Sequence, residues 1–287
     1  MTEPVVDTHT HVVSDDHSRY PLTPPEGLPR MSWFEEHPVT AEQLVEALDA
    51  GGVAGAVVVQ AKGAYGFDNS YAADAQALAP GRLVSASIID MESPNRLDQL
   101  NYWAADRGML GTRLFDIPTS SPSWLNDPAT ATVLNRARDL GIRISLCVLE
   151  GAIPLVGELL DLAPDIPMAL DHCGFADMSG PPPYAAAAPL FALNRHANLR
   201  LKVTTTQLAP GQAEVGDPRD VLEHLCEVFG AERLMWGSDY PQHHSEPYPE
   251  IVALAHHACS RLSPTEQARF LSGTAVELWP ELAAATS

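Results

Sequence analysis

The stretch VVDTHTH, residues 5–11, decides the fold, because an apolar strand runs directly into two histidines. Side chains alternate across a strand, so His9 and His11 are expected to point to one side. Two imidazoles on one side can converge on a metal ion or on a polar group of a substrate. In a (β/α)₈ barrel the active site lies at the carboxyl ends of the strands, and this pattern fits the first strand of such a barrel.

Seven further short apolar runs follow, and amphipathic stretches separate them. With the first run, Val5–Asp7, the predicted strands are Gly55–Gln60, Leu83–Ile88, Leu110–Leu114, Ile142–Leu146, Pro167–Asp171, Leu199–Val203 and Arg233–Trp236. This alternation is typical of serial βα units around a parallel sheet. The length of 287 residues suits one barrel. We therefore expect a single domain over residues 1–287, an α/β (β/α)₈ TIM barrel, regular or distorted.

Helix punctuation supports this order of elements. Thr40 and Gln43 have the spacing of a capping box that opens a helix over Ala41–Ala50, and Gly51 suits its C-terminal end. The other predicted helix starts are Asp127-Pro128, Asp217-Pro218 and Ser263-Pro264, and the other predicted ends are Gly141 and Gly230.

Composition excludes several classes of function. The formal net charge is −20, which argues against nucleic acid as a partner, because phosphate binding requires a basic surface. An anionic substrate would need arginine, lysine or histidine placed locally against that field. No apolar run is long enough to span a membrane and the first residues do not read as a signal peptide, so we expect a cytoplasmic protein. The four cysteines show no C-x-x-C pair and are predicted to be buried free thiols.

Two later strands also end in polar groups. The run RLMWGSDYP, residues 233–241, ends an apolar strand at Gly237 and places Asp239 directly after it. The run PMALDHCG, residues 167–174, does the same with His172. Separately, Asp239 could simply cap a turn and His172 could be a core histidine. Three such endings, on the first, sixth and eighth strands, favour a shared site.

These motifs resemble the amidohydrolase superfamily. D-T-H-x-H, L-D-H-x-G and M-W-G-S-D-Y-P are similar to the amidohydrolase-related branch that contains 2-pyrone-4,6-dicarboxylate lactonase and sugar-lactone hydrolases. Gln60 to Asn69 resembles the loop after the second strand in that branch, and Gly111 to Arg113 resembles a segment that supplies a substrate-binding arginine. The resemblance implies a hydrolase in which Asp239 activates water while His9, His11 and His172 polarise a carbonyl group.

The resemblance leaves the metal open. Metal-dependent members place a histidine on the fifth strand, where this chain has none, although Cys147 and Glu150 follow that strand. The tentative metal ligands are His9, His11 and Asp239. The cofactor is therefore either one divalent ion, zinc or manganese, or none at all.

A small molecule is the expected substrate, and several side chains are candidates to bind it. The predicted substrate-binding residues are Arg113, Lys202, Gln60, Tyr65 and Asn69. Lys202 has an alternative as a surface lysine whose stem packs on apolar groups. Since only Arg113 matches the arginines expected for a dicarboxylate, a sugar lactone or another neutral to monoanionic ester fits at least as well.

Two segments interrupt the βα rhythm, residues 14–38 and 174–189. Each follows a strand on the active-site side, so each could be a lid or a surface insertion. Apolar groups such as Trp33 also leave a homo-oligomer open. His243 and His244 could reach the site, but a paired histidine in a loop is more often exposed.

Three functions compete. The leading hypothesis is a hydrolase of a small cyclic ester or related carbonyl compound. The first alternative is a metal-dependent decarboxylase of an aromatic or dienoic acid. The second is a barrel that binds a metabolite without catalysis, which the presence of His9, His11 and Asp239 disfavours.

Overall fold

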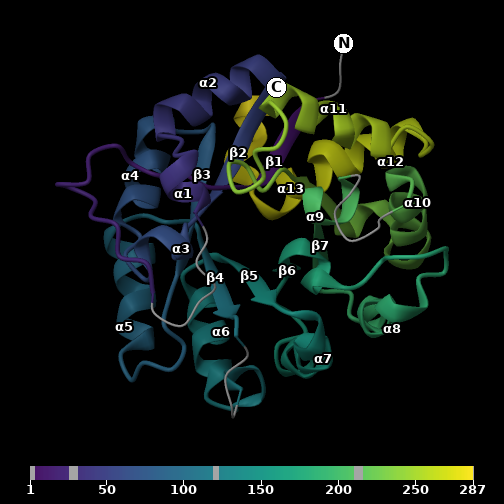
Figure 1. Ribbon diagram of the computed structural model, residues 1–287. Coiled ribbons are helices and arrows are strands. Elements are labelled where there is room, and N and C mark those ends of the chain that lie inside the picture. The colour runs from purple at the N-terminus through teal and green to yellow at the C-terminus, as the bar shows by residue number, and fades with distance from the viewer. Residues whose placement is uncertain (1–3, 26–31, 119–122, 210–215, 287) are drawn as a thin grey trace.

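The computed structural model describes residues 4–25, 32–118, 123–209 and 216–286. Over these residues, eight parallel strands stand at the centre and helices surround them, which is a (β/α)₈ TIM barrel (Figure 1). The strands are β1 (Val5–Thr10), β2 (Val53–Val59), β3 (Leu83–Ile88), β4 (Gly111–Asp116), β5 (Arg143–Val148), β6 (Met168–Leu170), β7 (Leu199–Thr204) and β8 (Leu234–Gly237). Each predicted strand is confirmed, with its ends shifted by a few residues.

The strands pair in sequence order from β1 to β8. The seam between β8 and β1 differs from the other pairings, because it is closed by an isolated bridge between Thr10 and Tyr240. The hydroxyl of Thr8 adds a hydrogen bond to the carbonyl oxygen of Trp236, at 2.6 Å. The barrel is therefore nearly closed, with an irregular seam beside the residues that carry the predicted chemistry.

The α-helices alternate with the strands and cover the outside of the barrel (Figure 1). They are α1 (Trp33–Glu36), α2 (Ala41–Gly51), α3 (Lys62–Tyr65), α4 (Ser70–Leu78), α5 (Arg96–Asn101), α6 (Thr130–Asp139), α7 (Ile153–Leu162), α8 (Ala188–Phe191), α9 (Thr205–Leu208), α10 (Pro218–Phe229), α11 (Tyr248–Ala258), α12 (Pro264–Ala268) and α13 (Thr274–Leu278). None of the helices in the described residues combines the length and apolar character needed to cross a lipid bilayer.

The helix signals are confirmed at three of the four predicted starts. Thr40 forms the capping box with Gln43, and Asp217 and Ser263 cap α10 and α12. At the fourth, the carboxylate of Asp127 accepts a hydrogen bond from the backbone of Ala129, and α6 begins at Thr130, two residues after Pro128. The predicted end of α2 was wrong by one residue, because Gly52, at φ 67°, adopts the left-handed conformation that ends this helix.

A tryptophan from the C-terminal region fills the lower barrel. Trp279 is fully buried in a cluster that includes Val6, Val57 and Met235 from the strands. It lies against Gly111, where an added Cβ would collide with the indole ring. Glycine is therefore required at the start of β4, because a larger residue would displace the tryptophan.

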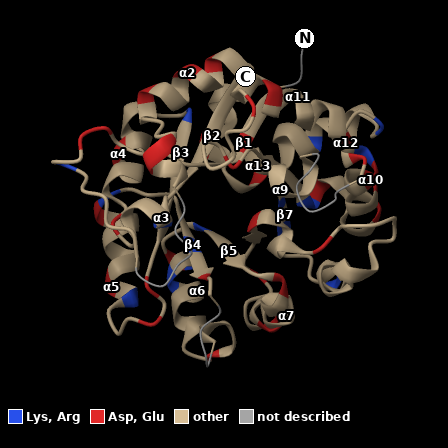
Figure 2. Cartoon of the chain, in the orientation of Figure 1, with Lys and Arg blue, Asp and Glu red and all other residues tan. Residues whose placement is uncertain are grey.

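Acidic residues are widespread on the helices that surround the barrel (Figure 2). This distribution accounts for the net charge of −20 as a solvated surface. The four cysteines are free, as predicted; Cys147, Cys173 and Cys259 are buried and Cys226 is partly exposed.

Candidate active site

The first strand delivers two histidines to the mouth of the barrel. His9 lies within β1 and is fully buried, and His11 follows the strand and is 3% exposed. The Nδ1 atom of His11 lies 2.8 Å from the carbonyl oxygen of Val59 on β2. A carbonyl oxygen only accepts, so Nδ1 of His11 must carry a proton, and its Nε2 atom faces the site.

The seam between β8 and β1 aims Asp239 at these histidines. At Gly237 an added Cβ would lie 2.8 Å from the Cβ atom of His9, so only glycine permits this approach. Asp7 accepts a hydrogen bond from the backbone of Ser238, and Asp239 donates its own to the carbonyl oxygen of His9. Asp239 has a φ of 59°, an uncommon conformation that these hydrogen bonds hold.

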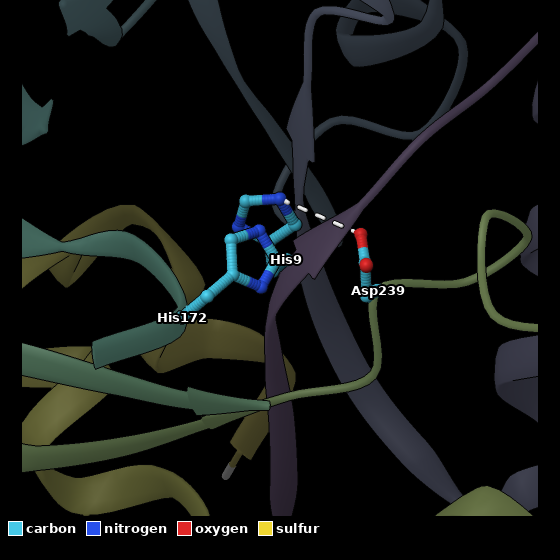
Figure 3. Close-up of side chains that lie close together, drawn as sticks. All are labelled: His9, His172 and Asp239. Carbon is cyan, nitrogen blue, oxygen red and sulfur yellow. Dashed lines mark ion pairs between the residues drawn. The ribbon is translucent and has the colours of Figure 1, made fainter. Parts of the chain in front are cut away.

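His172 comes from the opposite side of the mouth. It follows β6 in a short 3₁₀ turn, Asp171–Phe175, in which His172, Cys173, Gly174 and Phe175 have positive φ. This turn directs the imidazole of His172 toward the ring of His9, with ring centroids 4.5 Å apart. The ring of Phe175 stacks on the same imidazole, with centroids 4.8 Å apart. Figure 3 shows His9 and His172 side by side, with Asp239 opposite them.

The three groups form a compact buried cluster. Ligand atoms of His9, His172 and Asp239 lie within 4.8 Å of one another. Asp239 Oδ1 is 3.3 Å from Nε2 of His11 and 3.8 Å from Nε2 of His9. Asp239 Oδ1 and both ring nitrogens of His9 are buried and make no hydrogen bond to the described residues. Such orphaned polar atoms mark the place of a ligand.

The environment sets the charges of this cluster. Burial lowers the pKa of His172 to about 4 and holds the pKa of His9 well below its ordinary value, so both rings are neutral at pH 7. Burial opposes ionisation of Asp239, but the neighbouring imidazoles outweigh it and lower the pKa of its carboxyl group. The site at neutral pH is thus a carboxylate facing neutral imidazoles.

A hydrogen-bond chain assigns the proton of His172. The amide nitrogen of Gln207 donates to the backbone carbonyl of His172 at 2.7 Å, which leaves its amide oxygen as an acceptor. Thr204 donates its single hydroxyl proton to that oxygen. Thr204 must then accept from Nδ1 of His172, at 2.8 Å. His172 therefore presents an unprotonated Nε2 atom, the form suited to binding a cation or accepting a proton.

Removing the threonine hydroxyl should release this assignment. We expect Thr204→Val to move the His172 proton partly to Nε2 and to reduce kcat by about 10- to 100-fold, as for other groups that orient a functional histidine. The tautomer is read from the ¹⁵N chemical shifts of the ring. Thr204→Ser keeps the hydroxyl and should retain the wild-type shifts. Identical shifts in the valine variant would show that Thr204 does not set the tautomer.

The donor set of the cluster fits a divalent metal ion. Two imidazole nitrogens and a carboxylate oxygen are typical zinc ligands in a catalytic site that keeps a position for water. The orphaned atoms of His9 and Asp239 lie where such an ion would bind. His11, predicted as a ligand, contacts Asp239 but lies outside the three-residue group, whereas His172 belongs to it. The metal ligands remain a prediction, with His172 added as a candidate.

Below the cluster, Asp171 gathers the buried cations of the barrel. Its Oδ2 atom accepts from Nε of Arg113 at 2.7 Å, and its Oδ1 atom lies 3.0 Å from Nζ of Lys202 and 3.6 Å from Nδ1 of His9. Lys202 is fully buried, so the alternative of a surface lysine is wrong. Burial raises the pKa of Asp171, but its cationic neighbours outweigh burial and hold that pKa well below the ordinary value.

The remaining predicted substrate-binding residues are engaged with the loop after β2. Gln60 donates to the backbone carbonyls of Gly66 and Asp68. The hydroxyl of Tyr65 accepts from the backbone of Ser14, and Asn69 pairs with both backbone groups of Ile88. The structure thus gives Gln60, Tyr65 and Asn69 positioning contacts, and direct binding of substrate by them stays a prediction.

His243 and His244 are engaged beside the cluster. His243 pairs with Glu246 at 2.8 Å, and the rings of His244 and His37 lie close together in a tilted arrangement, with centroids 3.9 Å apart. His37 and His244 line a pocket of 390 Å³ together with Tyr240 and neighbouring residues. None of the three clustered residues lines that pocket.

The two interrupting segments both contact histidines of the candidate site. In the first, the ring of Trp33 lies 5.6 Å from the ring of His11, and residues 26–31 of that segment lie outside the described residues. In the second, Phe175 stacks on His172. Both segments therefore contribute to the walls of the site.

Two signals in the sequence point to residues that the sequence analysis did not assign. Asp171 directly precedes His172 in the L-D-H motif. Thr204-x-x-Gln207 has the spacing of a capping box after a strand, and the structure forms that box.

A barrel with a histidine and aspartate cluster at its carboxyl-terminal mouth defines a class of hydrolytic and lyase enzymes. The amidohydrolase family model matches residues 6–280, and the chain belongs to this family. It is 23% identical over 202 residues to an L-fucono-1,5-lactonase from Burkholderia ambifaria. The matched region covers 67% of this chain and 68% of the relative.

Solved structures share the fold at low identity. A protein described as a probable 2-pyrone-4,6-dicarboxylic acid hydrolase from Acinetobacter baumannii, with citric acid bound, has a TM-score of 0.77 and 19% identity, covering 96% of this chain and 99% of its own. An amidohydrolase from Burkholderia multivorans with bound zinc has a TM-score of 0.77 and 18% identity over the same shares. Decarboxylases of aromatic acids also share this barrel.

Proposed function

We propose that the protein hydrolyses a small-molecule lactone. The observation that carries this proposal is the cluster of Asp239, His9 and His172, whose functional atoms lie within 4.8 Å at the mouth of the barrel. A carboxylate beside neutral imidazoles combines a proton acceptor with nitrogen atoms that can hold a cation, and such a cation would polarise a carbonyl. The likeness to an L-fucono-1,5-lactonase supports a cyclic ester as the substrate.

In the proposed reaction, Asp239 accepts a proton from water as the water oxygen bonds to the lactone carbonyl carbon. The unprotonated nitrogen atoms of the neutral imidazoles cannot stabilise the negative charge that develops on the carbonyl oxygen; a divalent ion held by His9, His172 and Asp239 would supply that stabilisation. The ring C–O bond then breaks, and the alkoxide leaving group takes the proton from Asp239. The products are a hydroxy acid and the regenerated carboxylate.

The lowered pKa of Asp239 bears on the choice of cofactor. A carboxylate of low pKa is a weak base, so it removes a proton efficiently only from a water that is itself acidified. A divalent ion bound by His9, His172 and Asp239 would supply this acidification and polarise the carbonyl. The residues fit such an ion, and we include it in the proposed function.

Metal content provides a prediction for His172. We expect the purified protein to carry about one zinc or manganese ion per chain, and His172→Ala to retain less than about a tenth of that amount, since three protein ligands are the usual minimum of a catalytic site. Elemental analysis measures this. His256→Ala, at an outer histidine of α11, is the matched control. A variant that keeps its metal but turns over slowly would make His172 a polarising group and not a ligand.

Activity on a panel of five- and six-membered lactones, before and after chelation, tests the function itself. Hydrolysis that chelation abolishes supports the metal-assisted reaction. Hydrolysis that survives chelation would leave Asp239 and the histidines acting alone. Release of CO₂ from aromatic acids, with every lactone untouched, would replace the proposal with the decarboxylase alternative.

A further inference from the structure

The protein uses lysine at only two positions. Of its 17 basic side chains, Lys62 and Lys202 are the lysines, and the others are arginines. Lys202 is fully buried in the barrel, where Asp171 neutralises it. Lys62 lies in α3, directly after β2 and therefore at the same end of the barrel as the catalytic cluster. Neither lysine is an ordinary surface charge.

Lys62 is a half-buried cation without an anionic partner. Its Nζ atom lies 4.2 Å from the ring centroid of Phe67 and 4.5 Å from that of Phe115. Within the described parts of the chain it makes no side-chain hydrogen bond and no ion pair, and the carboxylates of Asp90 and Glu92 act on it only through their charge. Burial lowers the pKa of Lys62, and these two carboxylates oppose that change.

The second cation beside Phe115 is Arg113. Residues two apart on a strand share a side, so Arg113 and Phe115 of β4 both face the barrel interior. The guanidinium carbon of Arg113 lies 5.2 Å from the same ring that Lys62 approaches. Arg113 uses Nε for Asp171. Lys62, which follows β2, and Arg113, on β4, therefore approach the same aromatic ring.

This arrangement leaves the partly buried charge of Lys62 with aromatic neighbours and no counter-ion among the described residues. Removing an ammonium group from water is unfavourable, and an aromatic face returns only about 0.5–2 kcal/mol. The rest of the chain carries excess negative charge, yet two cations meet at the mouth. A local positive site is what an anionic substrate needs in a protein of net charge −20.

We propose that Lys62 and Arg113 form an anion subsite that binds a single carboxylate on the substrate. Resting on the proposed lactonase function, the substrate class is then a lactone bearing one carboxylate, with Phe67 and Phe115 packing against its carbon skeleton. Lys62 is the specificity-determining residue, because Arg113 is already tied to Asp171.

A matched pair of substrates tests the charge requirement. γ-Carboxy-γ-butyrolactone and γ-hydroxymethyl-γ-butyrolactone have the same ring and similar size, but only the first is anionic. Lys62→Met should lower kcat/KM for the anionic lactone by about 10- to 100-fold, as expected for loss of a charged hydrogen bond, and leave the neutral one within about twofold. Lys62→Arg should restore most of the rate. Arg138→Met, which removes an exposed charge from α6, is the control for net charge.

Equal losses on both lactones, or no loss on either, would overturn the subsite. A loss confined to the anionic lactone in both Lys62→Met and Arg138→Met would attribute the effect to the overall charge and would also overturn it.

The scarcity of lysine permits a second test that needs no hydrolysis. Reductive methylation with ¹³C-formaldehyde labels accessible amines such as that of Lys62, whereas Lys202 is fully buried, and Lys62→Met identifies the Lys62 signal. We expect cyclopentanecarboxylate to shift that signal and cyclopentanemethanol to leave it unchanged. A shift with both probes or with neither contradicts the subsite. If the wild type hydrolyses neither lactone but the carboxylate still shifts Lys62, the lactonase proposal fails and the subsite stands.

Discussion

Asp239→Asn should lower kcat by at least about 100-fold and leave the fold and most substrate binding intact, because the side chain keeps its shape but loses its negative charge and its ability to accept a proton. Asparagine suits this position, since it tolerates the φ of 59° that Asp239 adopts. Its backbone hydrogen bond to His9 is unaffected by the change, and an amide can still accept from Gln242.

Steady-state kinetics gives kcat and KM, and circular dichroism with thermal melting confirms the fold. Asp139→Asn, an exposed change on α6, is the control. Metal content should be measured on the same samples, because Asp239 belongs to the candidate metal cluster. A metal-free Asp239→Asn protein would assign the loss to ligation, and a fully loaded one to the missing base. A rate near that of the wild type would remove Asp239 from the mechanism.

Asp171→Asn should be the most destabilising conservative change in the barrel. The carboxylate compensates Arg113 at 2.7 Å and Lys202 at 3.0 Å, and all three side chains are at most 6% exposed. Breaking a buried ion pair by removing one partner leaves uncompensated charge and costs about 3–5 kcal/mol. We expect the free energy of unfolding to fall by about that amount, measured by urea denaturation.

A double-mutant cycle separates charge from packing. Lys202→Met removes one of the two cations, so Asp171→Asn combined with Lys202→Met should be more stable than Asp171→Asn alone. A loss below about 1 kcal/mol in the single variant would mean that the network is not electrostatically coupled.

The barrel and its main cluster could be predicted from the sequence because both leave local marks. Strands buried on both faces read as short apolar runs, and eight such runs with helices between them allow few other folds. His9, Asp239 and His172 each follow or end such a run, and the carboxyl ends of parallel strands meet at one mouth. Their convergence thus followed from the order of elements alone.

Other features of the site depend on contacts between distant segments. The role of Asp171 arises only when β4 and β7 bring Arg113 and Lys202 beside it. The partnership of Lys62 and Phe115 likewise joins residues from different βα units. Gln60 and Asn69 were predicted to bind substrate from their motif, but a motif does not reveal that backbone carbonyls already occupy their amide groups.

Local chain geometry was also beyond the sequence. Gly51 and Gly52 are adjacent, and both could end α2, so the sequence offered no basis for choosing between them. The positive φ angles of His172 and Phe175 could not be predicted from the sequence either, because bulky residues rarely adopt them. Tertiary contacts impose this turn and thereby aim the imidazole.

The irregular seam has a consequence for the time at which activity appears. The contacts that aim Asp239 join residues more than two hundred positions apart, with separations of 228 for Thr8 to Trp236 and 231 for Ser238 to Asp7. Contacts of such long range form late and slowly. During synthesis, a chain that has reached β7 already holds all three imidazoles but has no carboxylate to act with them. We therefore expect activity to appear only when the eighth strand has met the first.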